Sequence, residues 1–277
     1  MAHQGTSCGL GFRSIRRGAA GVALALSLAG AARSAELPAL RIGMDTRSRP
    51  WAYVPGLDYS KEDWTQPPRI GPEQIERLEG VDVDFMKALC ARLGVRPQVV
   101  PWAWASIEAG LLSGDFDVLI NAWVPNDHTP AAIVASAPYY EWGLLVAVRA
   151  DETSIHSFLD LRGRRVAHFR DRVVDLSVQN LGAASLVPLD DSDLLFDELA
   201  AGKVDAVVED STFVRWRVAQ DSAFRIVGDR LNRHGYHVAL RRQDAGLLAR
   251  VQRAILELNR SGEMERIRSR WEAPATR

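Results

Sequence analysis

The chain has 277 residues, of which 47% are hydrophobic and 25% are charged, and its formal net charge is −1. This composition excludes a largely disordered chain, and the near-neutral charge offers no basic surface for nucleic acid. The length exceeds what one ordinary domain needs and suits two lobes.

The first 35 residues differ from the rest of the chain. They contain four arginines and no acidic residue, and an apolar run extends over 19–32. The run is short for a membrane span and is followed by the small-x-small pattern Ala32-Arg33-Ser34. Residues 1–35 are therefore predicted to be a secretory signal peptide; an uncleaved anchor helix is the alternative. Arg16-Arg17 is only a fragment of a twin-arginine motif.

Removing this segment leaves 30 basic residues against 35 acidic ones, a net charge of −5. We therefore expect a periplasmic protein that is not inserted in a membrane once the signal is cleaved. Cys8 lies early in the signal, away from the position of a lipid-anchor cysteine, and Cys90 is then alone in the mature chain. Cys90 falls on the apolar stripe of a predicted helix, where a small core residue is expected.

Strands and helices are predicted to alternate through the rest of the chain, apart from a Pro-, Gly- and charge-rich surface insertion at 53–79. The elements in order are a strand at 40–44, a helix at 82–93, a strand at 97–100, a helix at 104–112, strands at 144–148 and 165–168, a helix at 173–181, a strand at 185–188, a helix at 191–200, a strand at 206–209, a helix at 211–219, a strand at 237–240 and helices at 245–259 and 262–271. Alternation of this kind predicts an α/β fold with largely parallel sheets covered by helices.

The chain contains an internal echo. Residues 112–120 (LSGDFDVLI) and 200–208 (AAGKVDAVV) each place a Gly at the end of a helix, an Asp three residues later and a short apolar strand after it. Glycine enters the left-handed conformation that ends a helix at little cost. Two such segments predict two similarly built α/β lobes.

These features resemble family 3 of the bacterial extracellular solute-binding proteins, the polar amino acid receptors of ABC transporters. The resemblance covers residues 40–271 and is carried by ordered landmarks, which are LRIGMD (40–45), Pro50-Trp51, EGVDVDFMKALCARLG (79–94), the two Gly-x-x-Asp echoes, APYYEWG (137–143), DLRGRRV (160–166) and SGEMERIRSRW (261–271).

The resemblance implies the two-lobed type II periplasmic-binding-protein fold, in which each lobe is a mainly parallel sheet flanked by helices. Lobe 1 is expected at 36–141 and 235–277, and lobe 2 at 142–234. Two crossing segments near 141–146 and 232–236 would join them, and the C-terminal helices would pack on the first lobe. Such proteins bind a small polar molecule at the carboxyl ends of parallel strands and close around it by a hinge motion. Membrane subunits of an ABC transporter are the implied partner.

The resemblance also implies site residues. Family receptors hold an amino acid with an arginine on its carboxylate, N–H groups of a Gly-Thr turn, an Asp on its ammonium group and aromatic rings over its side chain. Asp210 matches the ammonium-binding Asp, or is simply a helix N-cap. Asp45 matches a polar site position, or forms a turn. Trp104 matches an aromatic position, or packs in the core, and Trp123 and Tyr139 are weaker candidates.

Two departures from the family pattern affect the carboxylate-binding half of the site. Thr129 stands where the arginine is expected, and Asp171-Arg172 replaces the Gly-Thr turn. A neutral Thr cannot replace a forked guanidinium group. A positive partner could come from Arg170 or Arg172, or from two first-lobe arginines, Arg47 and Arg49; alternatively, these are solvated surface charges.

A ligand without a carboxylate is the other possibility. Asp45, Glu209 and Asp210 with the Trp104 ring would suit a cation. No cofactor, metal site or catalytic constellation is expected, because the six histidines are scattered and no nucleophile motif occurs. An accessory or sensor protein that binds another periplasmic protein, and a dehydratase-like enzyme on the same scaffold, remain alternatives.

Overall fold

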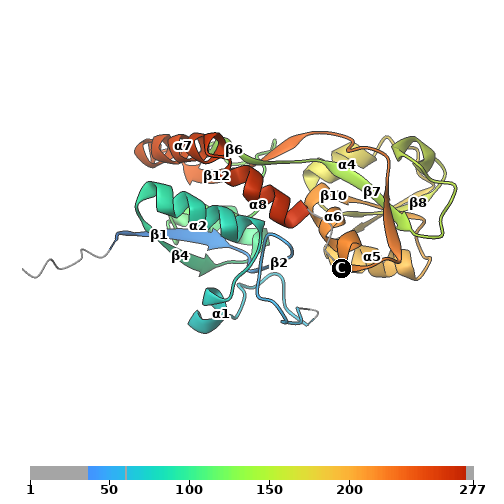
Figure 1. The fold of residues 1–277 in the computed structure, drawn as a ribbon, viewed down its shortest axis with the longest axis horizontal. Coiled ribbons are helices and arrows are strands. Elements are labelled where there is room, and N and C mark those ends of the chain that lie inside the picture. Colours follow the sequence, from blue (N-terminus) through green and yellow to red (C-terminus); the bar gives the residue numbers. More distant parts are fainter. Residues whose placement is uncertain (1–36, 60, 273–277) are drawn as a thin grey trace, which may run out of the picture. The chain divides into compact units, whose positions relative to one another are not determined.

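The computed structural model describes residues 37–59 and 61–272, with only the backbone at positions 172 and 173. The predicted signal peptide at 1–35 therefore lies outside the described residues. Within the described part of the chain, no helix is both long and apolar enough to cross a membrane. The described residues contain two five-stranded sheets, each with its own helices (Figure 1).

The first sheet has its parallel strands on one side. β1 pairs in parallel with β4 and β5, whereas β12 runs antiparallel to both β5 and β6. In spatial order its strands are β4 (Arg96–Pro101), β1 (Ala39–Met44), β5 (Val118–Leu119), β12 (His234–Arg241) and β6 (Ile133–Trp142). Its helices are α2 (Val81–Leu93), η1 (Trp104–Ser106), α3 (Ile107–Ser113), α7 (Ala245–Arg260) and α8 (Glu263–Glu272).

The second sheet repeats this plan. β8 pairs in parallel with β9 and β10, and β7 runs antiparallel to β10 and β11. In spatial order its strands are β11 (Phe224–Val227), β7 (Leu144–Arg149), β10 (Ala206–Asp210), β8 (Arg165–Phe169) and β9 (Ser185–Leu189). Its helices are η2 (Phe158–Leu161), α4 (Arg172–Val178), α5 (Ser192–Ala200) and α6 (Ser211–Gln220).

The predicted two-lobed α/β class is confirmed, with additions that the sequence pattern did not contain. Three neighbouring strands of each sheet are parallel, as βαβ units require. β12 and β7 run opposite to them, and the edge strands β6 and β11 pair antiparallel with β12 and β7. Strands β6 and β11 were not among the predicted elements. A small two-stranded sheet, β2 (Arg47–Ser48) with β3 (Ala52–Tyr53), ends where the insertion at 53–79 begins. The insertion itself contains a short helix, α1 (Pro72–Glu76).

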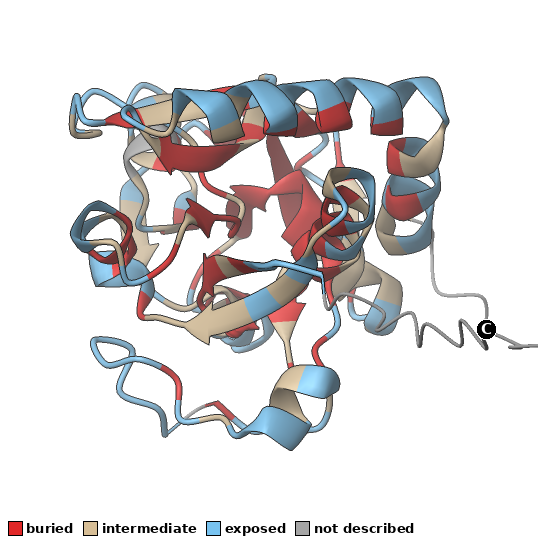
Figure 2. Ribbon diagram, turned by 90° about the vertical axis from the view of Figure 1, so that its left-hand side faces the viewer, coloured by how far each residue is buried: buried red, intermediate tan, exposed pale blue. Residues whose placement is uncertain are grey.

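The core lies where strands meet helices. Figure 2 shows buried strands at the centre and helices whose outer faces are exposed. α7 buries Val251, Ala254, Ile255 and Leu258, spaced as one face of a helix requires, and packs on α2 and on the first sheet, as predicted for the C-terminal helices. Cys90 is buried on α2, which confirms the prediction of a small core residue, and burial raises the pKa of its thiol to about 11.

The internal echo has a three-dimensional counterpart. Gly114 and Gly202 both have positive φ, as helix-ending glycines should. The Asp three residues after each glycine holds an arginine of the neighbouring strand through Nε at 3.2 Å and Nη2 at 2.6 Å; the pairs are Arg41–Asp117 in the first sheet and Arg165–Asp205 in the second. The same kind of Arg–Asp pair thus joins neighbouring parallel strands, near their amino ends, in both sheets.

Two chain segments join the sheets. The chain passes from β6 to β7 through Gly143 and comes back to β12 through 228–233. At the crossing the Asn232 side chain accepts a hydrogen bond from the Leu144 N–H at 2.9 Å, and a Cβ on Gly143 would overlap the Asn232 carbonyl oxygen. The lobe boundaries 36–141 with 235–277 and 142–234 stay our proposed division.

Candidate functional site

Asp45, which follows β1, has both carboxylate oxygens occupied by groups of this chain. Oδ1 accepts hydrogen bonds from the backbone N–H of Arg47 at 3.1 Å and from its Nε at 2.9 Å. Oδ2 accepts from Arg47 Nη2 at 2.8 Å and from the Trp104 N–H at 3.1 Å. The Asp45 side chain is fully buried, so its negative charge is balanced inside the protein.

The two first-lobe arginines are not solvated surface charges, contrary to that alternative. Arg47 is only 2% exposed, because its guanidinium is committed to Asp45. Arg49 is partly buried, and its Nη1 lies 2.9 Å from Asp193 Oδ2 at the start of α5 in the second lobe. Arg170 does fit the alternative, since it is half-exposed and pairs with the exposed Asp190. Arg47 and Arg49 are thus both paired within the chain.

The two tryptophans proposed as ligand-covering rings lie in different surroundings. Trp104 begins η1 and is 38% exposed, beside the Asp45 carboxylate that its N–H contacts. Trp123 is 2% exposed and packs with the cluster that includes Ile107 and Phe116, and its Nε1 donates to Glu108 Oε1 at 2.8 Å. Trp104 can therefore offer a ring face, whereas the Trp123 ring is enclosed by the core.

Asp210 ends β10, the central strand of the second sheet. Its Oδ1 accepts from the Thr212 N–H at 2.7 Å, so Asp210 is the N-cap of α6, the alternative role given for it; its match to the ammonium-binding Asp stays a prediction. Its Oδ2 accepts a hydrogen bond from the hydroxyl of Tyr236 on β12, and that hydroxyl accepts one from Trp51 Nε1 at 3.1 Å. Burial, opposed by these hydrogen bonds, raises the pKa of Asp210 to about 7.

Asp82, near the start of α2, is a second buried acid that the sequence argument treated only as a helix residue. It accepts hydrogen bonds of 2.6 Å from the Tyr139 hydroxyl and from the Ala122 N–H. Ala122 has a φ of 49°, a left-handed conformation that costs energy for a residue with a Cβ. Burial raises the pKa of Asp82 to about 7, and the charge of Asp210 adds to the rise. The charge of Asp210 is therefore felt at Asp82.

Glu209 lies beside Asp210 and is 3% exposed. Its Oε1 accepts from the Asp210 N–H at 2.9 Å, but its Oε2 has no hydrogen-bond partner. Burial raises its pKa well above the ordinary value, and the charges of Asp210 and Asp171 act in the same direction. Among the described side chains, none of the ion pairs involves Asp82, Glu209 or Asp210.

The positions that depart from the family pattern offer little for a carboxylate. Thr129 is half-buried and closes a turn, because its N–H donates to the Asn126 carbonyl at 3.1 Å and its Oγ1 accepts from the Asn126 N–H at 3.0 Å. Its neighbour His128 is largely exposed. Arg172 begins α4, but its side chain lies outside the described part of the structure. Thr129 therefore supplies a neutral hydroxyl where an arginine is expected.

Two cavities open elsewhere on the surface. One, of about 140 Å³, is lined by Arg47 and by eight residues of the insertion, which are Leu57, Asp58, Tyr59, Glu62, Pro68, Arg69, Ile70 and Gln74. The other, of about 420 Å³, lies against Leu112 and Arg241. Neither is lined by Asp82, Glu209 or Asp210. The first-lobe ring of Trp51 stacks instead on Phe213 of α6, with centroids 6.3 Å apart. In this arrangement the chain's own side chains cover the lobe-2 acids.

Two sheets of this topology, joined by two crossing segments and carrying buried polar groups at their carboxyl strand ends, define a two-lobed solute-binding protein. The sequence model of the bacterial extracellular solute-binding proteins, family 3, matches residues 63–274, and the chain belongs to this family.

Relatives and solved structures agree with this assignment. The chain is 27% identical to the L-cystine-binding protein TcyJ of Escherichia coli (strain K12) over 210 residues, covering 75% of the chain and 79% of that protein. It is 23% identical to the lysine/arginine/ornithine-binding periplasmic protein of the same strain over 249 residues, covering 84% and 94%. The structure of an ancestral arginine-binding protein bound to arginine superposes with a TM-score of 0.66 at 26% identity, covering 84% of this chain and 97% of that one.

Proposed function

We propose that the chain is a periplasmic receptor that captures a small ligand bearing an amino or other cationic group, closes its two lobes around it and delivers it to the membrane subunits of an ABC transporter. The family assignment and the names of the relatives support the amino-acid class of solute. The sequence of residues 1–35 supports export.

The positive charge proposed for the ligand is inferred from a set of buried acids. Asp82, Glu209 and Asp210 are each at most 6% exposed, and none is in an ion pair among the described side chains. A buried carboxylate without a cation is costly. A cationic ligand would relieve this cost, and the Trp104 ring beside Asp45 could cover an apolar or quaternary part of it.

The same geometry disfavours a free carboxylate on the ligand. Thr129 offers only a hydroxyl, and Asp45 has already neutralised Arg47. An amine or amino acid derivative without a free carboxylate should therefore bind better than the parent amino acid. Exchanging Thr129→Arg should reverse this preference, since a guanidinium would reach the position that the family uses.

Thermal shifts and calorimetry on the exported, purified protein test the proposal. Amino acids, their amides, polyamines, quaternary amines and organic acids should be compared at equal concentrations, because a ligand of the folded state raises the melting temperature by mass action. Amines should raise it and acids should not. A response confined to organic acids would contradict the proposal, and wild-type preference for free amino acids would remove the role assigned to Thr129.

Binding of another periplasmic protein is the second candidate. It is favoured by one observation: the Tyr236 hydroxyl, which Trp51 contacts, already occupies Asp210, and both Glu209 and Asp210 are closed to solvent in this arrangement. A protein that gives no shift with any small molecule, but binds a periplasmic partner, would support it. The dehydratase-like alternative is weaker, since its acidic substrate would meet buried carboxylates; steady turnover of a cyclic acid would revive it.

A further inference from the structure

The surroundings of Arg47 contact all three nitrogens of its guanidinium group. Nε and Nη2 face the two oxygens of Asp45 in the forked arrangement that carboxylates prefer, and Nη1 donates to the Asp63 carbonyl at 3.1 Å. The Trp64 ring lies over the guanidinium carbon, 4.6 Å from its centroid. Each nitrogen of the guanidinium, and one face, therefore has a partner.

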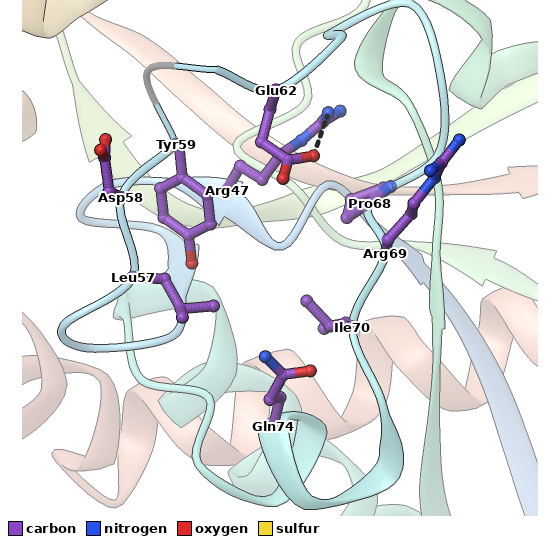
Figure 3. A pocket seen from close by; sticks show the side chains of 9 residues that line it. All are labelled: Arg47, Leu57, Asp58, Tyr59, Glu62, Pro68, Arg69, Ile70 and Gln74. Atoms are coloured by element: carbon purple, nitrogen blue, oxygen red, sulfur yellow. Dashed lines mark ion pairs between the residues drawn. The ribbon is translucent and has the colours of Figure 1, made fainter.

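These contacts come from two separate parts of the chain. Asp45 belongs to the carboxyl end of β1, whereas Asp63 and Trp64 belong to the insertion at 53–79. Figure 3 shows the Glu62 carboxylate turned toward Arg47, with an Nη1 distance of 3.9 Å, beside the cavity of about 140 Å³ that Arg47 itself lines. Removing the Arg47 side chain would extend this cavity to the Asp45 carboxylate.

We propose that Asp45, the Asp63 carbonyl and the Trp64 ring make up a guanidinium-binding site that Arg47 fills from within the same chain. The insertion then closes the first-lobe acid to ligands, and the wild-type receptor refuses a guanidinium or a similar basic group there. Ligand charge must be met at the acids of the second lobe and α2 instead. The site is a property of the first lobe and does not depend on the proposed function.

Arg47→Ala tests this proposal with ethylguanidinium as the probe. The variant leaves Asp45 buried with backbone hydrogen bonds but without a cation, so it should melt well below the wild type. Ethylguanidinium, at concentrations that leave the wild-type melting temperature unchanged, should raise that of the variant. Binding measured by calorimetry should be about tenfold tighter for ethylguanidinium than for ethylammonium, because only the planar fork matches both oxygens. Ethylurea, which is neutral and similar in shape, should not bind.

Arg41→Ala is the matched control. Arg41 lies on β1, the strand that Asp45 follows, and pairs with Asp117 through the same two nitrogens, but its side chain is 40% exposed. Ethylguanidinium should give no saturable response there, since water already solvates the freed carboxylate. Adding Trp64→Leu to Arg47→Ala should weaken the response by several-fold, and adding Asp45→Asn should abolish it.

The outcomes separate the possibilities. A folded Arg47→Ala protein that binds ethylguanidinium no better than ethylammonium or ethylurea overturns the proposal. If Arg47→Ala does not fold in plain buffer, recovery of fold in ethylguanidinium supports it, and failure to recover while Asp45→Asn/Arg47→Met folds overturns it. Adding Asp210→Asn to Arg47→Ala should leave the ethylguanidinium response intact, because Asp210 is not part of this site. Failure of the proposed function has a different sign, which is a wild-type protein that binds no amine.

Discussion

The hydroxyl of Tyr236, on the strand that returns to the first sheet, donates a hydrogen bond to the carboxylate of Asp210, at the end of the central strand of the second. The acid that matches the family's ammonium-binding Asp is thus tied to the segment about which the lobes would move. Under the proposed function, this contact would couple the binding of a charged ligand to the position of the lobes.

Asp210→Asn should weaken binding of a cationic ligand by about 10- to 100-fold, the usual loss when a charged hydrogen-bond partner becomes neutral. Asparagine is as good an N-cap as aspartate, so α6 should keep its stability. Calorimetric titration measures the loss. Asp205→Asn, at the opposite end of the same strand, should lower stability through its contact with Arg165 but leave affinity unchanged; equal loss of affinity in both variants would show that Asp210 acts only through the fold.

The pH dependence of stability should report the buried acids. Burial raises the pKa of Asp82 and of Asp210 to about 7, whereas an aspartate in the unfolded chain titrates near about 4. Between these values the folded protein holds protons that the unfolded chain has released, so the free energy of unfolding should fall as pH rises from about 4 to about 7.

Asp82→Asn should reduce this slope by up to about 1.4 kcal/mol per pH unit, the contribution of one group. Urea unfolding at pH 5, 6, 7 and 8 gives the slope. Asp151→Asn, where the carboxylate is 87% exposed, is the control and should leave it unchanged. An unaltered slope in Asp82→Asn would mean that Asp82 is not a proton-holding group of the folded protein.

Arg49→Gln should favour an open arrangement of the lobes. Arg49 pairs with Asp193 of the second lobe at 2.9 Å, and both groups are partly buried. A distance between fluorophores placed on the two lobes should lengthen in the ligand-free variant. Arg170→Gln, the control, breaks an exposed pair inside the second lobe and should not change that distance. An unchanged distance in Arg49→Gln would show that the Arg49–Asp193 pair does not hold the lobes together.

Gly143→Ala should destabilise the protein by roughly 1–3 kcal/mol, the usual cost of overpacking, because its Cβ would overlap the Asn232 carbonyl at the crossing. Gly246→Ala is the contrasting change, since this glycine lies in α7 with nothing near the added Cβ. It should stabilise the protein by up to about 1 kcal/mol. Urea midpoints compare the two, and a neutral Gly143→Ala would show that the crossing segments can separate freely.

The order of elements was predictable because its signals are local. The helix-ending Gly114 and Gly202, and the apolar stripe of α7, each depend on a few neighbouring residues. Strands β6 and β11 were missed because they are paired antiparallel at the sheet edges, outside any βαβ unit.

The candidate site was less predictable because its contacts join distant segments. Asp82 meets Tyr139, 57 positions away, and no spacing rule announces that pair. An arginine such as Arg47 is expected at the surface from its residue type alone. Its burial depends on Asp63 and Trp64, which lie 16 or more positions away in the sequence. Trp123 was a candidate ligand-covering ring but lies in the core. Residue type alone does not distinguish a tryptophan that packs in a core from one that covers a ligand.

The ion pairs Arg41–Asp117 and Arg165–Asp205 lie toward the amino ends of the parallel strands, whereas Asp45 and Asp210 lie at the carboxyl ends. The Arg–Asp pairs that join the strands and the acids of the proposed solute site thus lie on opposite rims of each sheet. Substitutions at one rim can therefore accumulate without loosening the other. A scaffold divided in this way can acquire a new selectivity by point mutation while its architecture stays fixed.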